Sequence, residues 1–100
     1  MRTLRTPANN FAIALKSARK LMNLSQEDFG LVSSRTYISS LERGLGSPTL
    51  SKVDELAAVL GVHPLTLLFL AYAPKQSSEQ IENLHDLVLN EVKGLGELAR

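Results

Sequence analysis

The chain has 100 residues, 44% hydrophobic and 21% charged, with a formal net charge of +1, and this length suits one small domain rather than a multidomain enzyme. It has no cysteine and only two isolated histidines, so we expect no disulfide, no metal site and no cofactor. The longest apolar run, residues 67–73, is far shorter than the about 20 residues that cross a bilayer, and residues 1–6 lack a signal-peptide core. We therefore expect a cytoplasmic protein with no membrane partner.

Charge is distributed unevenly along the chain. Residues 1–75 carry nine Lys and Arg against five Asp and Glu, whereas residues 76–100 carry two against five. This distribution favours a basic N-terminal part, residues 1–75, that binds a polyanion, and an acidic C-terminal part, residues 76–100, that has a separate role.

The chain divides into three predicted parts. Residues 1–8 show no periodicity and contain Arg2 and Arg5, which predicts a flexible basic arm able to add contacts to a polyanion. Residues 9–74 carry the pattern of a helical domain. Residues 75–100 are predicted to form a linker followed by a C-terminal helix.

The first helix of the domain has clear signals at both ends. Asn9 or Asn10 caps its start, and Asn23 in a left-handed conformation ends it. Its apolar residues recur at helical spacing and predict one buried face: Phe11, Leu15, Ala18 and Met22.

Two further helices follow at once. Ser25 and Asp28 form a capping-box variant that starts a short second helix, roughly residues 26–31. After a break, Ser34 caps a third helix that ends at Gly44. The apolar residues of the third helix are predicted to point inward: Ile38 and Leu41. Its other residues point outward: Arg35, Thr36, Ser39 and Ser40.

Two more helices complete the domain. Thr49 caps a fourth helix that ends at Gly61, and Pro64 opens a fifth that runs to about Ala73. The fourth helix carries a continuous apolar stripe: Leu50, Val53, Leu56, Ala57 and Leu60.

A sixth, acidic helix follows a polar linker at residues 75–78. Its apolar residues recur at three and four positions: Ile81, Leu84, Val88, Val92 and Leu95. Gly94 and Gly96 weaken the end of this helix, so Leu95 and Leu98 are predicted to lie in a frayed tail. No strand pattern is present in the sequence.

The predicted fold class is therefore all-α, with five packed helices plus a C-terminal amphipathic helix. Two short helices joined by a tight turn, the second small and polar on its outer face, form the arrangement that places a helix in the DNA major groove.

Four motifs occur in order between about Phe11 and Leu70: residues 25–29 (SQEDF), 34–44 (SRTYISSLERG), 47–50 (SPTL) and 56–62 (LAAVLGV). They resemble the helix-turn-helix family of phage Cro proteins and repressors, often called the XRE family. The resemblance covers about two thirds of the chain and implies a five-helix repressor-like DNA-binding domain.

The resemblance also implies roles for individual residues. The third helix would be the recognition helix, with Arg35, Thr36 and Ser40 meeting base edges. Arginine suits a bidentate contact to guanine, and threonine offers a hydroxyl or a methyl group to thymine. The candidate contacts to the DNA backbone are Gln26, Tyr37, Ser39 and Arg43. Tyr37 has an equally supported alternative, which is packing against the second helix. A structural salt bridge is implied between Arg19 and Glu42.

One segment departs from the family pattern. Relatives usually have two more residues between the Ser-Gln start and the Tyr-Ile pair, which here are Ser25-Gln26 and Tyr37-Ile38. The second helix is therefore expected to be clipped and the turn to be made by residues 32–34 alone. This contraction puts the position of Gln26 in question.

The sixth helix has three candidate roles. Repressors of this kind pair two copies across a palindrome, so its apolar stripe is a candidate for homodimerisation, through Ile81, Leu84, Val88 and Val92. It can instead pack on residues 67–72 of its own chain, or bind another protein, as in an antitoxin-like protein or interaction module.

These observations together predict a sequence-specific DNA-binding transcriptional regulator of bacterial or phage type that binds double-stranded DNA as a dimeric repressor or autoregulator. No nucleophile and base are arranged by motif, so we expect no enzymatic activity. The chain leaves no room for a sensor domain, so no small-molecule ligand is expected.

Overall fold

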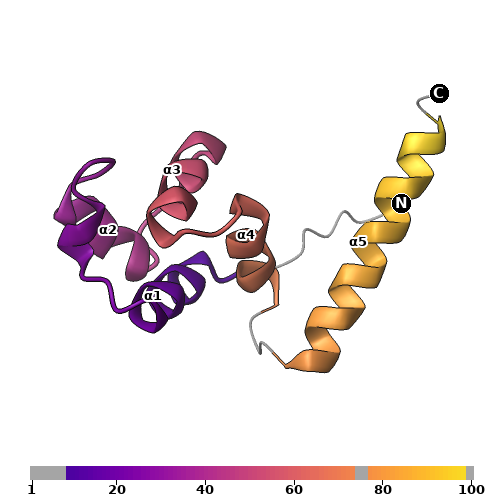
Figure 1. The fold of residues 1–100 in the computed structure, drawn as a ribbon, viewed down its shortest axis with the longest axis horizontal. Helices are drawn as coiled ribbons and strands as arrows, with labels where there is room; N and C mark the ends of the chain where they lie inside the picture. The colour runs from indigo at the N-terminus through magenta and orange to yellow at the C-terminus, as the bar shows by residue number, and fades with distance from the viewer. Residues whose placement is uncertain (1–8, 74–76, 99–100) are drawn as a thin grey trace, which may run out of the picture.

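The computed structural model describes residues 9–73 and 77–98, and helices are the only regular secondary structure within those ranges. The basic arm predicted at residues 1–8 lies outside them. The helices, in chain order, are α1 (Phe11–Leu21), the 3-10 helix η1 (Gln26–Phe29), α2 (Arg35–Glu42), α3 (Leu50–Leu60), α4 (Pro64–Tyr72) and α5 (Ser78–Leu98). Figure 1 shows the first five gathered into one body, with α5 at its side. The all-helical prediction, with a C-terminal helix, is confirmed.

Helix ends lie at the predicted capping residues. The side chains of Asn10, Ser34 and Thr49 each accept a hydrogen bond from the backbone N–H three residues on. Gly61 ends α3 with a φ of 75°, a left-handed conformation that glycine adopts without steric cost. These local signals are confirmed because each cap depends on residues adjacent in the chain.

The core lies where α1, η1, α2, α3 and α4 meet. Phe29 is its largest fully buried side chain and anchors the short η1 between the neighbouring helices. The backbone N–H of Asn10 also donates to the Ala71 carbonyl at 2.8 Å, which ties the start of α1 to the end of α4. The buried cluster comprises Ala14, Leu15, Phe29, Ile38, Leu41, Val53, Leu56, Leu60, Leu67 and Ala71.

The second helix is clipped, as the contracted segment predicted, and is shorter than the range of about 26–31 given by periodicity; the turn begins at residue 30, so the prediction that residues 32–34 make it alone is wrong. The helix is a single 3-10 turn that ends at Phe29, and Leu31, expected within the helix, is fully exposed in the turn that follows. The backbone N–H groups of Val32 and Ser33 both donate to the Phe29 carbonyl, so the chain turns immediately after Phe29. The contraction seen in the sequence is therefore absorbed by η1.

Two residues assigned to apolar faces are exposed, and those assignments were wrong. Met22 lies just past the end of α1, next to left-handed Asn23. Leu50 is the first residue of α3, where side chains tilt toward the helix N-terminus and so away from the core that Val53 and Leu56 enter.

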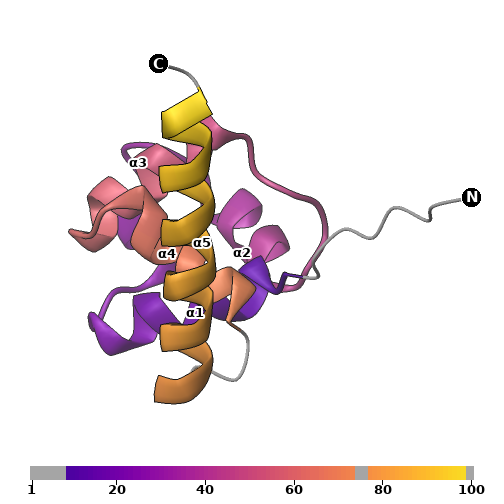
Figure 2. The ribbon, with the colours of Figure 1, turned by 90° about the vertical axis from the view of Figure 1, so that its right-hand side faces the viewer.

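Helix α5 lies beside α4 on the outer side of the body, as the two perpendicular views show (Figures 1 and 2). It remains helical through Gly94 and Gly96 to Leu98, so the predicted frayed end is wrong for the backbone. Two glycines cost helical stability without ending a helix whose remaining residues favour it.

In the part of the chain that the structure describes, no single helix is both long and apolar enough to span a membrane. Taken together, α3 and α4 meet both the length and the apolar composition of such a span, but they are bent by 105° relative to each other.

Candidate nucleic-acid interface

Helix α2 is held by its inner face and presents its outer face to solvent. Ile38 and Leu41 are buried in the core, and the Ser34 hydroxyl caps the first turn by accepting from the Tyr37 N–H at 3.1 Å. On the opposite face Arg35, Ser39 and Arg43 recur every four residues, which aligns them in one stripe along the helix. The stripe combines two cations with a small hydroxyl residue.

A shallow polar hollow of about 220 Å³ lies between η1 and the outer face of α2. It is lined by Gln26, Arg35, Thr36, Ser39 and Arg43. Gln26 therefore remains next to α2 despite the contracted segment. The hollow brings five residues that were predicted to contact DNA onto one surface.

Arg35 is loosely held. Its guanidinium Nη1 lies 3.8 Å from the carboxylate of Glu27 in η1, and both side chains are mostly exposed to solvent. An ion pair of this kind contributes about 0–1 kcal/mol to stability. Arg35 can therefore leave Glu27 for another partner at little cost.

The other predicted contact residues differ in their surroundings. Ser40 is partly buried and lies at the flank of α2, outside the hollow. Tyr37 is partly buried against the core, which is the position of a packing residue. The Arg43 Nε donates weakly to the Ser39 carbonyl at 3.4 Å within the same stripe.

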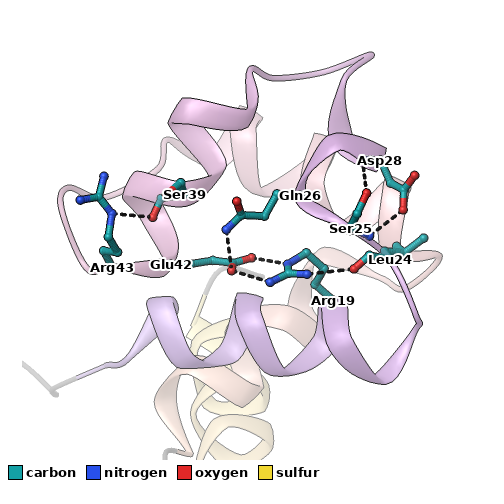
Figure 3. Close-up of polar contacts among 8 residues, drawn as sticks. All are labelled: Arg19, Leu24, Ser25, Gln26, Asp28, Ser39, Glu42 and Arg43. Atoms are coloured by element: carbon teal, nitrogen blue, oxygen red, sulfur yellow. Dashed lines mark hydrogen bonds and ion pairs between the residues drawn. The ribbon is translucent and has the colours of Figure 1, made fainter.

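A partly buried ion pair between α1 and α2 supports the interface (Figure 3). Arg19 of α1 donates to both carboxylate oxygens of Glu42 of α2, at 2.6 and 2.8 Å, and also to the Leu24 carbonyl at 2.9 Å. The two side chains are only 12% and 3% exposed. The bidentate pair ties α1 to α2, and the bond to Leu24 ties both helices to the segment that precedes η1.

The same carboxylate holds Gln26. The amide Nε2 of Gln26 donates to Glu42 Oε1 at 3.2 Å, as Figure 3 shows. Burial raises the pKa of Glu42, but the hydrogen bonds from Arg19 and Gln26 outweigh it, so the pKa lies below its ordinary value. The hydrogen bond to Glu42 likewise raises the pKa of Arg19. Both groups are charged at neutral pH.

Two residues near this surface were not predicted from the sequence. Glu27 pairs with Arg35, which lies eight residues after it in the sequence. Lys52 donates to the carbonyl of Val32 in the turn before α2, which lies twenty residues before it. Neither spacing carries a local signal, because the contacts depend on how the helices pack.

The sequence profile described as helix-turn-helix matches residues 15–67, which is more than half of the chain. The matched region runs from within α1 into α4 and includes the entire hollow. No curated protein matches the chain.

Proposed function

Because the chain belongs to the XRE-type helix-turn-helix family of DNA-binding transcriptional regulators, we propose that it is a dimeric repressor or autoregulator that reads a palindromic operator. The observation that carries the proposal is the polar hollow on α2, where an exposed arginine with a single weak ion pair is followed by a threonine.

We place α2 in the major groove. Arg35 there exchanges the exposed carboxylate of Glu27 for the N7 and O6 atoms of a guanine. Thr36 reads the neighbouring base pair through its hydroxyl or methyl group. Ser40, at the flank of α2, is small enough to allow close approach to a base edge.

The remaining residues of the surface are assigned to the sugar-phosphate backbone. Gln26, Ser39 and Arg43 supply an amide, a hydroxyl and a guanidinium around the base-reading pair, and such contacts set the register of a protein on DNA. Tyr37 reaches the backbone only with its hydroxyl, because its ring packs against the core.

We propose α5 as the dimerisation element. Ile81 and Leu84, near its start, line apolar grooves of about 450 and 370 Å³ together with Leu65 and Phe69 of α4. Farther along the same face, Val88, which also lines the second groove, and Val92 remain 38% and 60% exposed. An exposed apolar stripe on an acidic helix suits a second copy of the same helix, held away from the DNA.

Replacing Arg35 with alanine tests the proposed base contact. We expect wild-type protein to bind DNA from upstream of its own gene more tightly than scrambled DNA of equal length, measured by fluorescence anisotropy at near-physiological salt. Arg35→Ala should weaken binding to the cognate DNA by about 1–3 kcal/mol and relax the preference at one base pair of each half-site.

Lys93→Ala on α5 is the matched control, since it removes one exposed positive charge outside the hollow. It should leave the preference unchanged. An equal loss of affinity for cognate and scrambled DNA in Arg35→Ala would make Arg35 a phosphate contact and refute its proposed role.

A further inference from the structure

We infer that Lys52 of α3 is a positioning residue that holds the turn before the recognition helix, and so sets where Arg35 and Thr36 meet DNA. The proposed effect of Lys52 on DNA binding rests on the proposed function, whereas the contact of Lys52 with the turn does not depend on it.

The side chain of Lys52 crosses from α3 to the turn. Its Nζ donates to the backbone carbonyl of Val32 at 2.5 Å, and the side chain is only 22% exposed. A charged donor on a partly buried carbonyl makes a stronger hydrogen bond than a neutral one. Glu55, one turn farther along α3, lies 3.4 Å from the same Nζ, but its side chain is 44% exposed, so this ion pair contributes little to holding the lysine.

Lys52 also meets the recognition helix itself. Its Nζ lies 5.8 Å from the centroid of the Tyr37 ring, within the range of a cation–π interaction. One ammonium group therefore contacts both the turn and the first turn of α2.

The location of Lys52 is electrostatically unfavourable for α3. Thr49 caps this helix by accepting from the Lys52 N–H, so the lysine lies in the first turn, where the helix dipole disfavours a cation. The contacts with Val32 and Tyr37 offset this cost. The contacts of Lys52 with other parts of the fold, and not the stability of α3 itself, therefore explain why a lysine is present at this position.

The turn that Lys52 contacts is tight, because the Val32 and Ser33 N–H groups both donate to the Phe29 carbonyl. Gly30 has an ordinary right-handed conformation, and within the described ranges positive φ values occur only at Asn23, Gly44, Gly46 and Gly61. The turn therefore reverses the chain without a left-handed residue. Its Val32 carbonyl lies just before the Ser33-Ser34 pair that starts α2, so a shift of this carbonyl moves the start of the recognition helix.

The test compares Lys52→Met, which keeps the length of the side chain without its charge, with Lys52→Arg and wild type. Amide hydrogen exchange of Val32 and Ser33 is measured alongside anisotropy on the upstream duplex over a range of salt. We expect Lys52→Met to speed exchange in the turn and to weaken DNA binding, each about tenfold, with an unchanged salt slope. Lys52→Arg should restore both.

The matched control is Glu55→Gln, which leaves the Val32 contact in place and should bind DNA within about twofold of wild type. A salt slope lower by about 0.9 per protomer in Lys52→Met would identify a direct phosphate contact and overturn the inference. So would exchange that rises equally in α1 and α3, or affinity that does not change. If wild type binds no duplex selectively, the proposed function fails, while the exchange data still decide whether Lys52 holds the turn.

Discussion

Glu42→Gln is expected to lower the free energy of unfolding by about 3–5 kcal/mol, because it leaves the guanidinium of Arg19 buried without its counter-charge. A domain of this size is stabilised by only about 5–15 kcal/mol in total, so the variant should be near the limit of stable folding. Urea unfolding followed by far-ultraviolet circular dichroism at pH 7 measures the change.

Glu55→Gln provides the control, since its carboxylate is more exposed and pairs with a single lysine. The control should change stability by about 0–1 kcal/mol. A Glu42→Gln variant as stable as wild type would show that the buried ion pair does not hold α1 and α2 together.

The same pair predicts how stability depends on pH. The pKa of Glu42 is lower in the folded chain than in the unfolded one, despite the opposing effect of burial, because Arg19 and Gln26 donate hydrogen bonds to its carboxylate. Its stabilising contribution is therefore present above the ordinary pKa of glutamate and is lost as the pH falls through the lowered value. Glu42→Gln should flatten the acid limb of the wild-type stability profile.

Placing charges on the apolar face of α5 is expected to abolish the dimer. Val88→Glu/Val92→Glu would bury two carboxylates per chain in the proposed interface, at a cost of several kcal/mol. Because a monomer presents one recognition helix where a dimer presents two, affinity for the operator should fall by about 100-fold or more. Light scattering and anisotropy measure the two effects.

The control places the same charges on the opposite face of the same helix. Asn83→Glu/Asn90→Glu adds equal charge at exposed positions about half a turn away from Val88 and Val92. It should remain dimeric and keep its affinity. A wild-type chain that is monomeric at micromolar concentration, or a valine variant that still dimerises, would contradict the role proposed for α5.

Local features were predictable from the sequence, and long-range ones were not. The caps at Asn10, Ser34 and Thr49 depend on residues three positions apart, and the buried positions Ile38 and Leu41 follow from helical periodicity. The pairing of Arg19 with Glu42 was accessible only through the family resemblance, because 23 residues separate the two in sequence.

The remaining differences arise from tertiary packing. Periodicity alone continued the second helix to Leu31, whereas the buried Phe29 and its carbonyl close the chain into a turn two residues earlier. The contact of Lys52 with Val32 has no signature in either segment, since it exists only once α3 packs beside the turn. Five residues named from the family resemblance thus line one hollow, and their contact with DNA stays a prediction, whereas the contacts that position them could not be predicted from the sequence.

The central claim is that two copies of α2 read a symmetric DNA site, and selection of binding sites from a random duplex library tests it most directly. We expect enrichment of a palindrome whose half-sites are centred one helical turn, about 10 base pairs, or a multiple of it apart. A selected site without twofold symmetry, or no enrichment over the starting library, would contradict it.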